Sequence, residues 1–137
     1  MIRFETKVRV RYGETDQMGY VYYGVYAQYY EVGRVETMRS LGFSYKEVEH
    51  RGVLMPVVDY CINYKKPAFY DDELTIVTRI KELPEGVKLP FEYECFNAAG
   101  ELLNSGKVTL VFLDKATNKL TQIPAWFYDA LKPFFIK

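Results

Sequence analysis

The stretch from Tyr12 to Arg34 reads YGETDQMGYVYYGVYAQYYEVGR, and it decides the fold predicted for the chain. Two acidic residues, Glu14 and Asp16, flank a threonine near its start, and no other acidic residue follows before Glu31. Most residues between Asp16 and Glu31 are aromatic or small. This pattern predicts a loop that carries carboxylates, followed by a helix whose first half is buried.

Apolar side chains recur at three- and four-residue steps after this loop, which predicts a long helix over residues 22–41. Gly42 suits the position just after the helix. Three small residues in the helix lower its intrinsic propensity, so we expect a sheet to approach closely there. They are Gly24, Ala27 and Gly33.

Alternating apolar and polar residues predict strands on either side of this helix. They cover residues 3–12 before it and 53–65, 74–83, 87–96 and 102–113 after it, the last four with the spacing of an antiparallel meander. Ser44 and Glu47 form a capping box for a short second helix that ends near Gly52, and Pro124 suits the start of a short terminal helix. The predicted fold class is α+β, a single domain over residues 1–137 with a strongly bent sheet around one central helix.

The strand over residues 53–65 has two notable features. Pro56 interrupts it and predicts a β-bulge or an edge position at its start. Its alternating residues predict a buried face made of Val58, Tyr60, Ile62 and Tyr64. The two cysteines of the chain, Cys61 here and Cys95 in a later strand, are predicted to be reduced thiols of the core.

The composition excludes several classes of function. Lys and Arg together number 18, as do Asp and Glu, so no global positive field favours nucleic acid. Two cysteines and one histidine cannot supply a four-ligand zinc site from those residue types alone. No segment has the character of a signal peptide or a membrane span, so we expect a cytoplasmic protein. The 13 Tyr and 9 Phe residues favour an additional buried interface, and hence an oligomer.

Few residues are candidates for catalysis. The chain has no Gly-x-Ser-x-Gly motif, and His50, its single histidine, is expected at the solvated end of a short helix. Asp16 precedes the long helix, whose first backbone N–H groups carry a partial positive charge. One interpretation is that Asp16 is a loop or capping residue. The other is that Asp16 acts as a base or nucleophile on a carbonyl held by those N–H groups.

Other charged residues have both structural and functional interpretations. Glu31 and Arg34 are three residues apart on the predicted helix, a spacing that favours a structural ion pair. Four lysines are either candidates for a phosphate contact or solvated surface charges, namely Lys65, Lys66, Lys81 and Lys88.

The chain resembles the hot-dog-fold acyl-CoA thioesterases, in particular the 4-hydroxybenzoyl-CoA thioesterase type and its Tol–Pal-associated relatives. The resemblance rests on Glu14-Thr15-Asp16, Gly19, Val21-Tyr22-Tyr23, Tyr26, Glu31 and Arg34, and it continues through residues 52–58 and 70–76. It implies a five-stranded antiparallel sheet wrapped around one long helix. It also implies a homodimer joined edge to edge, with active sites at the interface; assembly into a homotetramer is left open.

The resemblance further implies roles for individual residues. Asp16 would be the catalytic carboxylate, which attacks the thioester or activates water, and the backbone N–H of Tyr23 would polarise the thioester carbonyl. Gly19 would let the loop approach the substrate. The other implied substrate-binding positions, some from the partner subunit, are Tyr22, Tyr26, Met55, Val57 and Val58. No metal or bound cofactor is implied, because the CoA thioester is itself the substrate.

The chain departs from this family pattern at two places. Tyr23 stands where the Tol–Pal type has a histidine, so a mechanism that relies on that imidazole cannot operate. The hydroxybenzoyl type has a basic cluster for the CoA phosphates after its third strand, and here only Lys88 keeps the charge. CoA binding would then be looser, use Lys65 or Lys66, or give way to an acyl-carrier-protein substrate.

The leading hypothesis is an acyl-CoA thioesterase that hydrolyses an aromatic or aliphatic acyl-CoA to the free acid and CoA. A hot-dog dehydratase or hydratase would need a catalytic histidine, for which His50 is poorly placed. A non-catalytic acyl-CoA-binding module is the other alternative. The acyl group, its chain length, the choice between CoA and acyl carrier protein, and the choice between nucleophilic and general-base attack stay open.

Overall fold

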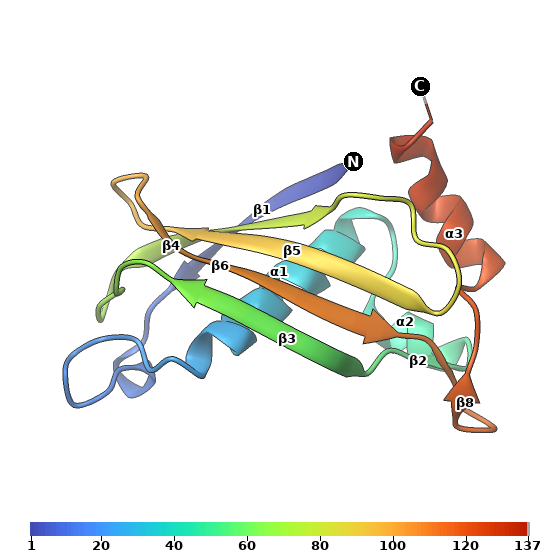
Figure 1. Cartoon of the computed structure of the whole chain (residues 1–137), viewed down its shortest axis with the longest axis horizontal. Coiled ribbons are helices and arrows are strands. Elements are labelled where there is room, and N and C mark those ends of the chain that lie inside the picture. Colours follow the sequence, from blue (N-terminus) through green and yellow to red (C-terminus); the bar gives the residue numbers. More distant parts are fainter. Residues whose placement is uncertain (137) are drawn as a thin grey trace.

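The computed structural model describes residues 1–136, and Figure 1 shows the elements that these residues form. The main sheet contains β1 (Ile2–Arg9), β3 (Val57–Tyr64), β4 (Glu73–Ile80), β5 (Lys88–Phe96) and β6 (Leu102–Val111). A second, small sheet contains β2 (Val53–Leu54), β7 (Leu113–Asp114) and β8 (Lys119–Leu120). The helices are α1 (Val25–Ser40), α2 (Tyr45–His50) and α3 (Ala125–Leu131), and two 3₁₀ turns are η1 (Tyr12–Glu14) and η2 (Lys132–Phe134).

The strands of the main sheet lie in the order β1-β4-β5-β6-β3, and each neighbouring pair is antiparallel. The predicted meander is therefore correct for β4, β5 and β6 and wrong for β3. The reason is that β1 pairs with β4 along its full length, from Ile2 with Ile80 to Arg9 with Glu73. Because β5 holds the other edge of β4, the strand β3 pairs with β6 at the far edge of the sheet.

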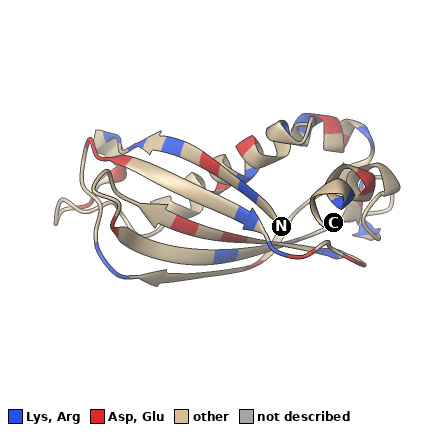
Figure 2. Cartoon of the chain, turned by 90° about the horizontal axis from the view of Figure 1, so that it is seen from above, with Lys and Arg blue, Asp and Glu red and all other residues tan. Residues whose placement is uncertain are grey.

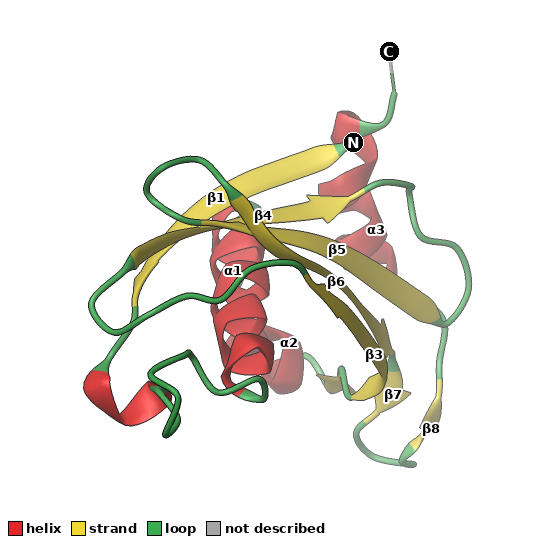
Figure 3. Cartoon of the chain, turned by 60° about the vertical axis from the view of Figure 1, so that its left-hand side comes forward, coloured by secondary structure: helices red, strands yellow, loops and turns green. Residues whose placement is uncertain are grey.

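Helix α1 lies on the concave side of the bent sheet (Figure 3), which confirms the expected sheet wrapped around one long helix. The helix begins at Val25, after Gly24, and not at the predicted Tyr22. Gly42 has the positive φ, +100°, expected just after a helix. Close packing explains the small residue at Gly33, since a Cβ atom there would lie 2.6 Å from Thr78 Oγ1 and 2.9 Å from Ile76 Cγ2.

The core lies between α1 and the concave face of the sheet. Alternate residues of the central strands are fully buried there, which confirms the predicted two-residue period. They include Leu74, Ile76 and Ile80 on β4 and Leu89, Phe91, Tyr93 and Cys95 on β5. The predicted terminal helix is α3, which closes one end of this core. Phe127 of α3 packs against Phe43 and Phe112, with ring centroids 4.8 and 5.4 Å away.

Strand β3 is an edge strand, and its start contains the bulge predicted from Pro56, between Val57 and Asp59. Its predicted buried face is wrong for the single chain, because Tyr60 is 37% exposed and Tyr64 is 50% exposed. The physical reason is that β3 pairs only with β6 and that no other element of the described chain covers it. Val58 is exposed for the same reason, and only Ile62 is half-buried.

The two cysteines have different environments, and both are free thiols. Cys95 is buried as predicted, and burial raises the pKa of its thiol to about 12. Cys61 is exposed on the edge strand β3, so its assignment to the core is wrong.

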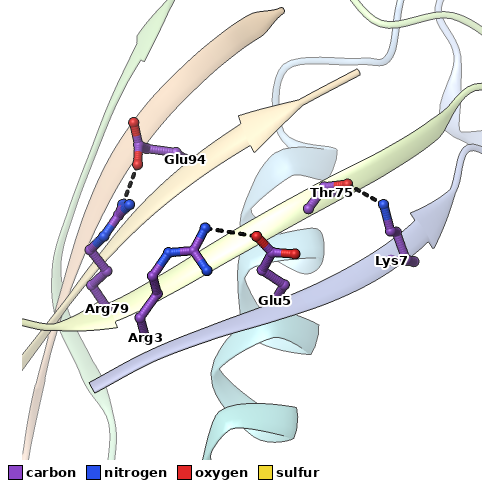
Figure 4. A network of polar contacts seen from close by, with 6 residues as sticks. All are labelled: Arg3, Glu5, Lys7, Thr75, Arg79 and Glu94. Carbon is purple, nitrogen blue, oxygen red and sulfur yellow. Dashed lines mark hydrogen bonds and ion pairs between the residues drawn. The ribbon is translucent and has the colours of Figure 1, made fainter. Parts of the chain in front are cut away.

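The strands of the main sheet carry charged residues of both signs along their length (Figure 2). Arg3 pairs with Glu5 at 2.7 Å, Lys7 donates to Thr75 Oγ1 at 2.7 Å, and Arg79 pairs with Glu94 (Figure 4). No helix among residues 1–136 is long and apolar enough to cross a membrane. In the same residues, no three His, Cys, Asp or Glu side chains gather as metal ligands.

Candidate active site

The segment between η1 and α1 forms a closed loop. An isolated bridge pairs Thr15 with Val21 at its base. Inside it, Asp16 N donates to Tyr20 O at 2.8 Å and Gly19 N donates to Asp16 O at 3.0 Å. Gly19 has a φ of +83°, a left-handed conformation that glycine adopts without a steric penalty. The tight turn therefore explains the glycine and sets the position of Asp16.

The two oxygens of Asp16 have different environments. Oδ1 accepts hydrogen bonds from the backbone N–H groups of Met18, at 2.9 Å, and Tyr20, at 3.2 Å. Oδ2 has no hydrogen-bond partner among the described residues. Asp16 caps its own loop and not the helix, because the N-cap of α1 is Gly24. One oxygen is thus held by the backbone, while the other is left available to react.

The start of α1 offers backbone N–H groups that are free to bind an anion. Val25 N donates to Tyr22 O at 2.9 Å, but in the described chain the N–H groups of Tyr23 and Gly24 have no acceptor. The hydroxyl of Tyr64 on β3 donates to Tyr23 O at 3.1 Å and thereby holds the peptide that joins Tyr23 to Gly24. A carbonyl oxygen that gains negative charge is stabilised by such N–H groups at a helix start.

Asp16 and the start of α1 meet in one cavity of about 300 Å³. Aromatic and apolar side chains form most of its wall, and two lysines lie at its side. The lining residues are Asp16, Met18, Tyr20, Val21, Tyr23, Tyr26, Tyr64, Lys65, Lys66 and Pro67. Burial raises the pKa of Tyr26 to about 12, so its hydroxyl is neutral at physiological pH. The cavity can hold an apolar group beside a carboxylate.

Of the four candidate lysines, Lys81 pairs with Glu92 at 3.3 Å, and the structure separates the other three. Lys65 lines the Asp16 cavity and makes no ion pair within residues 1–136. Lys66 also lines it, but its ammonium group pairs with Glu101. Lys88 lies at the start of β5 and lines a different cavity with Glu82 and Glu85. Of the three, Lys65 is the one free to bind a phosphate near Asp16.

Several residues of the expected acyl pocket are not brought to this cavity by the single chain. Met55, Val57 and Val58 lie at or before the start of β3, whereas the cavity is at the other end of this strand, beside Tyr64. Tyr22 packs on the ring of Tyr23, with centroids 4.6 Å apart, and does not line the cavity. Gly19 shapes the loop and does not line the cavity.

Two further predictions have different outcomes. His50 is exposed at the C-terminal end of α2, as predicted. The expected ion pair between Glu31 and Arg34 is not found among the described residues. Arg34 is buried and donates instead to the hydroxyls of Tyr45, at 3.0 Å, and Tyr93, at 3.3 Å. Its partners come from α2 and β5, which helical spacing alone cannot reveal.

Sequence reasoning missed the environment of Glu14. Its carboxylate is buried and accepts hydrogen bonds from the Tyr29 hydroxyl at 2.9 Å, from Arg11 N at 2.8 Å and from the Arg11 guanidinium. Burial acts to raise the pKa of Glu14, but the hydrogen bonds from Arg11 and Tyr29 outweigh burial and hold the pKa below its usual value. The signal in the sequence was a glutamate three residues after Arg11, just before a turn.

Comparison with known proteins gives a consistent result. The sequence model of the thioesterase-like superfamily matches residues 10–131. The Bacillus subtilis protein YneP is 41% identical over 90% of this chain and 88% of its own length. The Escherichia coli acyl-CoA thioester hydrolase YbgC is 35% identical over 88% of this chain and 90% of its own length. A solved DHNA-CoA thioesterase from Staphylococcus aureus is 35% identical, with a TM-score of 0.89, over 98% of this chain and 89% of its own.

Proposed function

The chain belongs to the thioesterase-like superfamily and is a thioester hydrolase, and on this premise we propose that it hydrolyses an acyl-CoA to the free acid and CoA. One observation carries the proposal. Asp16, whose Oδ2 is unpartnered, and Tyr23, whose backbone N–H is free, line the same aromatic cavity. A carboxylate and an oxyanion site are sufficient for a thioester, whose carbonyl is more electrophilic than that of an amide.

Asp16 can act in two ways. As a nucleophile, Oδ2 adds to the thioester carbon, the C–S bond breaks, and the CoA thiolate leaves and takes a proton from solvent; water then hydrolyses the acyl anhydride. As a general base, Asp16 takes a proton from the water that attacks the carbonyl, and that proton passes to the leaving sulfur. In both routes the N–H of Tyr23 donates to the carbonyl oxygen as it gains charge. Neither route needs a metal or a bound cofactor.

The edge strand supports a homodimer, which a dimer of dimers would extend to a homotetramer. β3 offers unpaired backbone groups and exposed apolar side chains, which favour pairing with a second sheet edge. The two ends of β3 lie about 23 Å apart at ~3.3 Å a residue. Antiparallel pairing of two copies of β3 would therefore bring Val57 and Val58 of the partner subunit towards Tyr64. In this way, the implied acyl-pocket residues would reach the cavity of the other copy.

The leaving group is proposed to be CoA, with Lys65 beside the cavity for a phosphate. The thioester hydrolase YbgC and the DHNA-CoA thioesterase both carry CoA in their names, which supports CoA as the leaving group. The tyrosines of the cavity suit an aromatic or an aliphatic acyl group, since each ring has a flat apolar face and a hydroxyl. We place the enzyme in the cytoplasm, where CoA thioesters are formed.

The test is release of free CoA thiol from benzoyl-, hydroxybenzoyl-, short-, medium- and long-chain acyl-CoAs, with wild type and Asp16→Asn compared. We expect turnover of at least one substrate and a loss in the variant of at least ~100-fold in kcat, the lower end of an acid–base contribution. Asp129→Asn, a change of an exposed carboxylate on α3 outside the cavity, serves as the control. Saturable binding of acyl-CoA with no turnover by wild type would refute hydrolysis in favour of a binding module. Full activity of Asp16→Asn would remove Asp16 from the mechanism.

A further inference from the structure

We infer that Glu14 is a positioning residue for this reaction, because its buried side chain and its carbonyl together fix the Asp16 loop relative to the start of α1. The inference rests on the proposed function. Glu14 stands two residues before Asp16 and does not line the cavity, so it acts through the backbone and not on the substrate.

The side chain of Glu14 joins two separate elements. Oε1 accepts from Arg11 N at 2.8 Å, just after β1, and from the hydroxyl of Tyr29 at 2.9 Å, in the second turn of α1. Oε2 accepts from the guanidinium of Arg11, with distances of 3.2 Å from Nε and 2.9 Å from the terminal nitrogen. Tyr29 is buried with an exposed fraction of 2%, so its hydroxyl has no access to water as a substitute partner.

The backbone of Glu14 continues this connection to both catalytic groups. Glu14 O accepts from Tyr22 N at 2.9 Å, and Tyr22 immediately precedes the Tyr23 N–H. On the other side, the bridge between Thr15 and Val21 closes the loop that holds Asp16. A displacement of Glu14 therefore changes the distance between the carboxylate and the oxyanion site.

Two substitutions of Glu14 distinguish a positioning role from a direct effect of its negative charge. Oε1 accepts the two hydrogen bonds that hold Glu14 in place, one from Arg11 N and one from the hydroxyl of Tyr29. A glutamine keeps one carbonyl oxygen that can accept both, and loses only the contacts between Oε2 and the exposed guanidinium. An alanine loses all of them and leaves the hydroxyl of Tyr29 buried without an acceptor.

The experiment compares Glu14→Gln, Glu14→Ala and Tyr29→Phe, with Glu36→Gln as a matched control. Glu36 also pairs with an arginine three residues away, Arg39, but lies in the second half of α1 and does not line the Asp16 cavity. We measure kcat, KM and melting temperature for each variant, and the amide hydrogen exchange of residues 15–24.

A misplaced catalytic group costs up to about 100-fold in rate, so we expect kcat of Glu14→Ala to fall at least ~10-fold with KM changed less than ~3-fold. Glu14→Gln should stay within ~3-fold of wild type in kcat, and Tyr29→Phe should lie between the two. The amides of Tyr20 and Tyr22 should exchange faster in Glu14→Ala than in Glu14→Gln. Glu36→Gln should match wild type throughout.

Two results would overturn the inference. One is a Glu14→Gln variant as inactive as Glu14→Ala with unchanged amide exchange, which would assign the effect to the charge itself. The other is a Glu14→Ala variant that retains both wild-type kcat and wild-type exchange. If wild type hydrolyses no acyl-CoA, the proposed function fails separately, and the exchange of residues 15–24 still decides whether Glu14 orders this loop.

Discussion

Replacement of Gly33 by alanine tests how tightly α1 is seated on the sheet. The added Cβ would lie 2.6 Å from Thr78 Oγ1 and 2.9 Å from Ile76 Cγ2, well inside normal contact distance. Thr78 Oγ1 has no hydrogen-bond partner in the described chain, so its hydroxyl can turn away without breaking a bond. Ile76 is fully buried, so relief of the second contact requires a shift of the helix or of β4.

Two opposing effects set the magnitude of this change. An extra methyl group in a packed core costs ~1–3 kcal/mol. Alanine gains ~1 kcal/mol over glycine in helix propensity. Because the site cannot relax freely, we expect an overpacking cost in the upper part of that range, ~2–3 kcal/mol, and hence a net loss of about 1–2 kcal/mol in the free energy of unfolding. For a domain of this size, the melting temperature should fall by about 3–6 °C.

The assay is thermal unfolding of wild type, Gly33→Ala and Gln28→Ala. Gln28 is an exposed residue of the same helix, so its change to alanine tests propensity without packing. Its melting temperature should stay within about 1 °C of wild type, since Gln and Ala differ little in helix propensity. A Gly33→Ala protein that melts at or above the wild-type temperature would refute the packing argument.

Two other predictions concern charges at the site. The pKa of Glu14 is held below its ordinary value of 4.5, so its ionised form stabilises the fold above that pH, and this contribution is lost as the pH falls through the folded-state pKa. Glu14→Gln should therefore melt below wild type at pH 7, and the difference should vanish in acid; a difference that grows in acid would contradict this sign. Lys65→Ala should raise KM for acyl-CoA by ~2–5-fold at low salt with kcat unchanged, and added salt should reduce the effect, as for an exposed charge contact. Lys88→Ala, at the distant cavity, should leave KM as in wild type; a larger effect there than at Lys65 would reverse the assignment.

Much of the fold could be predicted from local patterns. Strand alternation and helical spacing depend on neighbours a few residues away, so β1, β4, β5, β6, α1 and α3 were found within a few residues of their bounds. The start of α1 was placed three residues too early, because the apolar spacing continues back through Tyr22 although the backbone becomes helical only at Val25. The left-handed conformation of Gly42 and the bulge after Pro56 could be predicted, because each depends on the backbone preference of one residue.

The candidate site could be predicted only in part. Asp16 was singled out because it is a carboxylate that precedes a helix start, where free N–H groups can hold a carbonyl, and the structure places it in a cavity with Tyr23 and Tyr26. The sequence pattern could not distinguish Lys65 from Lys88, because the choice depends on which cavity each residue borders. It also could not show that Asp16 Oδ1 is bound while Oδ2 is free, since this follows from the turn that Gly19 closes.

The period of each element, the α+β class and the carboxylate that precedes α1 follow from local spacing and residue type, so each could be predicted before the three-dimensional structure was known. Three features follow only from the tertiary structure: β3 pairs with β6 and not with β4, Arg34 bonds to Tyr45 and Tyr93, and Glu14 meets Tyr29. These three outcomes depend on which distant segments pack together. Which segments pack together depends on how the whole chain buries its apolar surface and pairs its hydrogen-bonding groups. A short stretch of sequence does not contain this information.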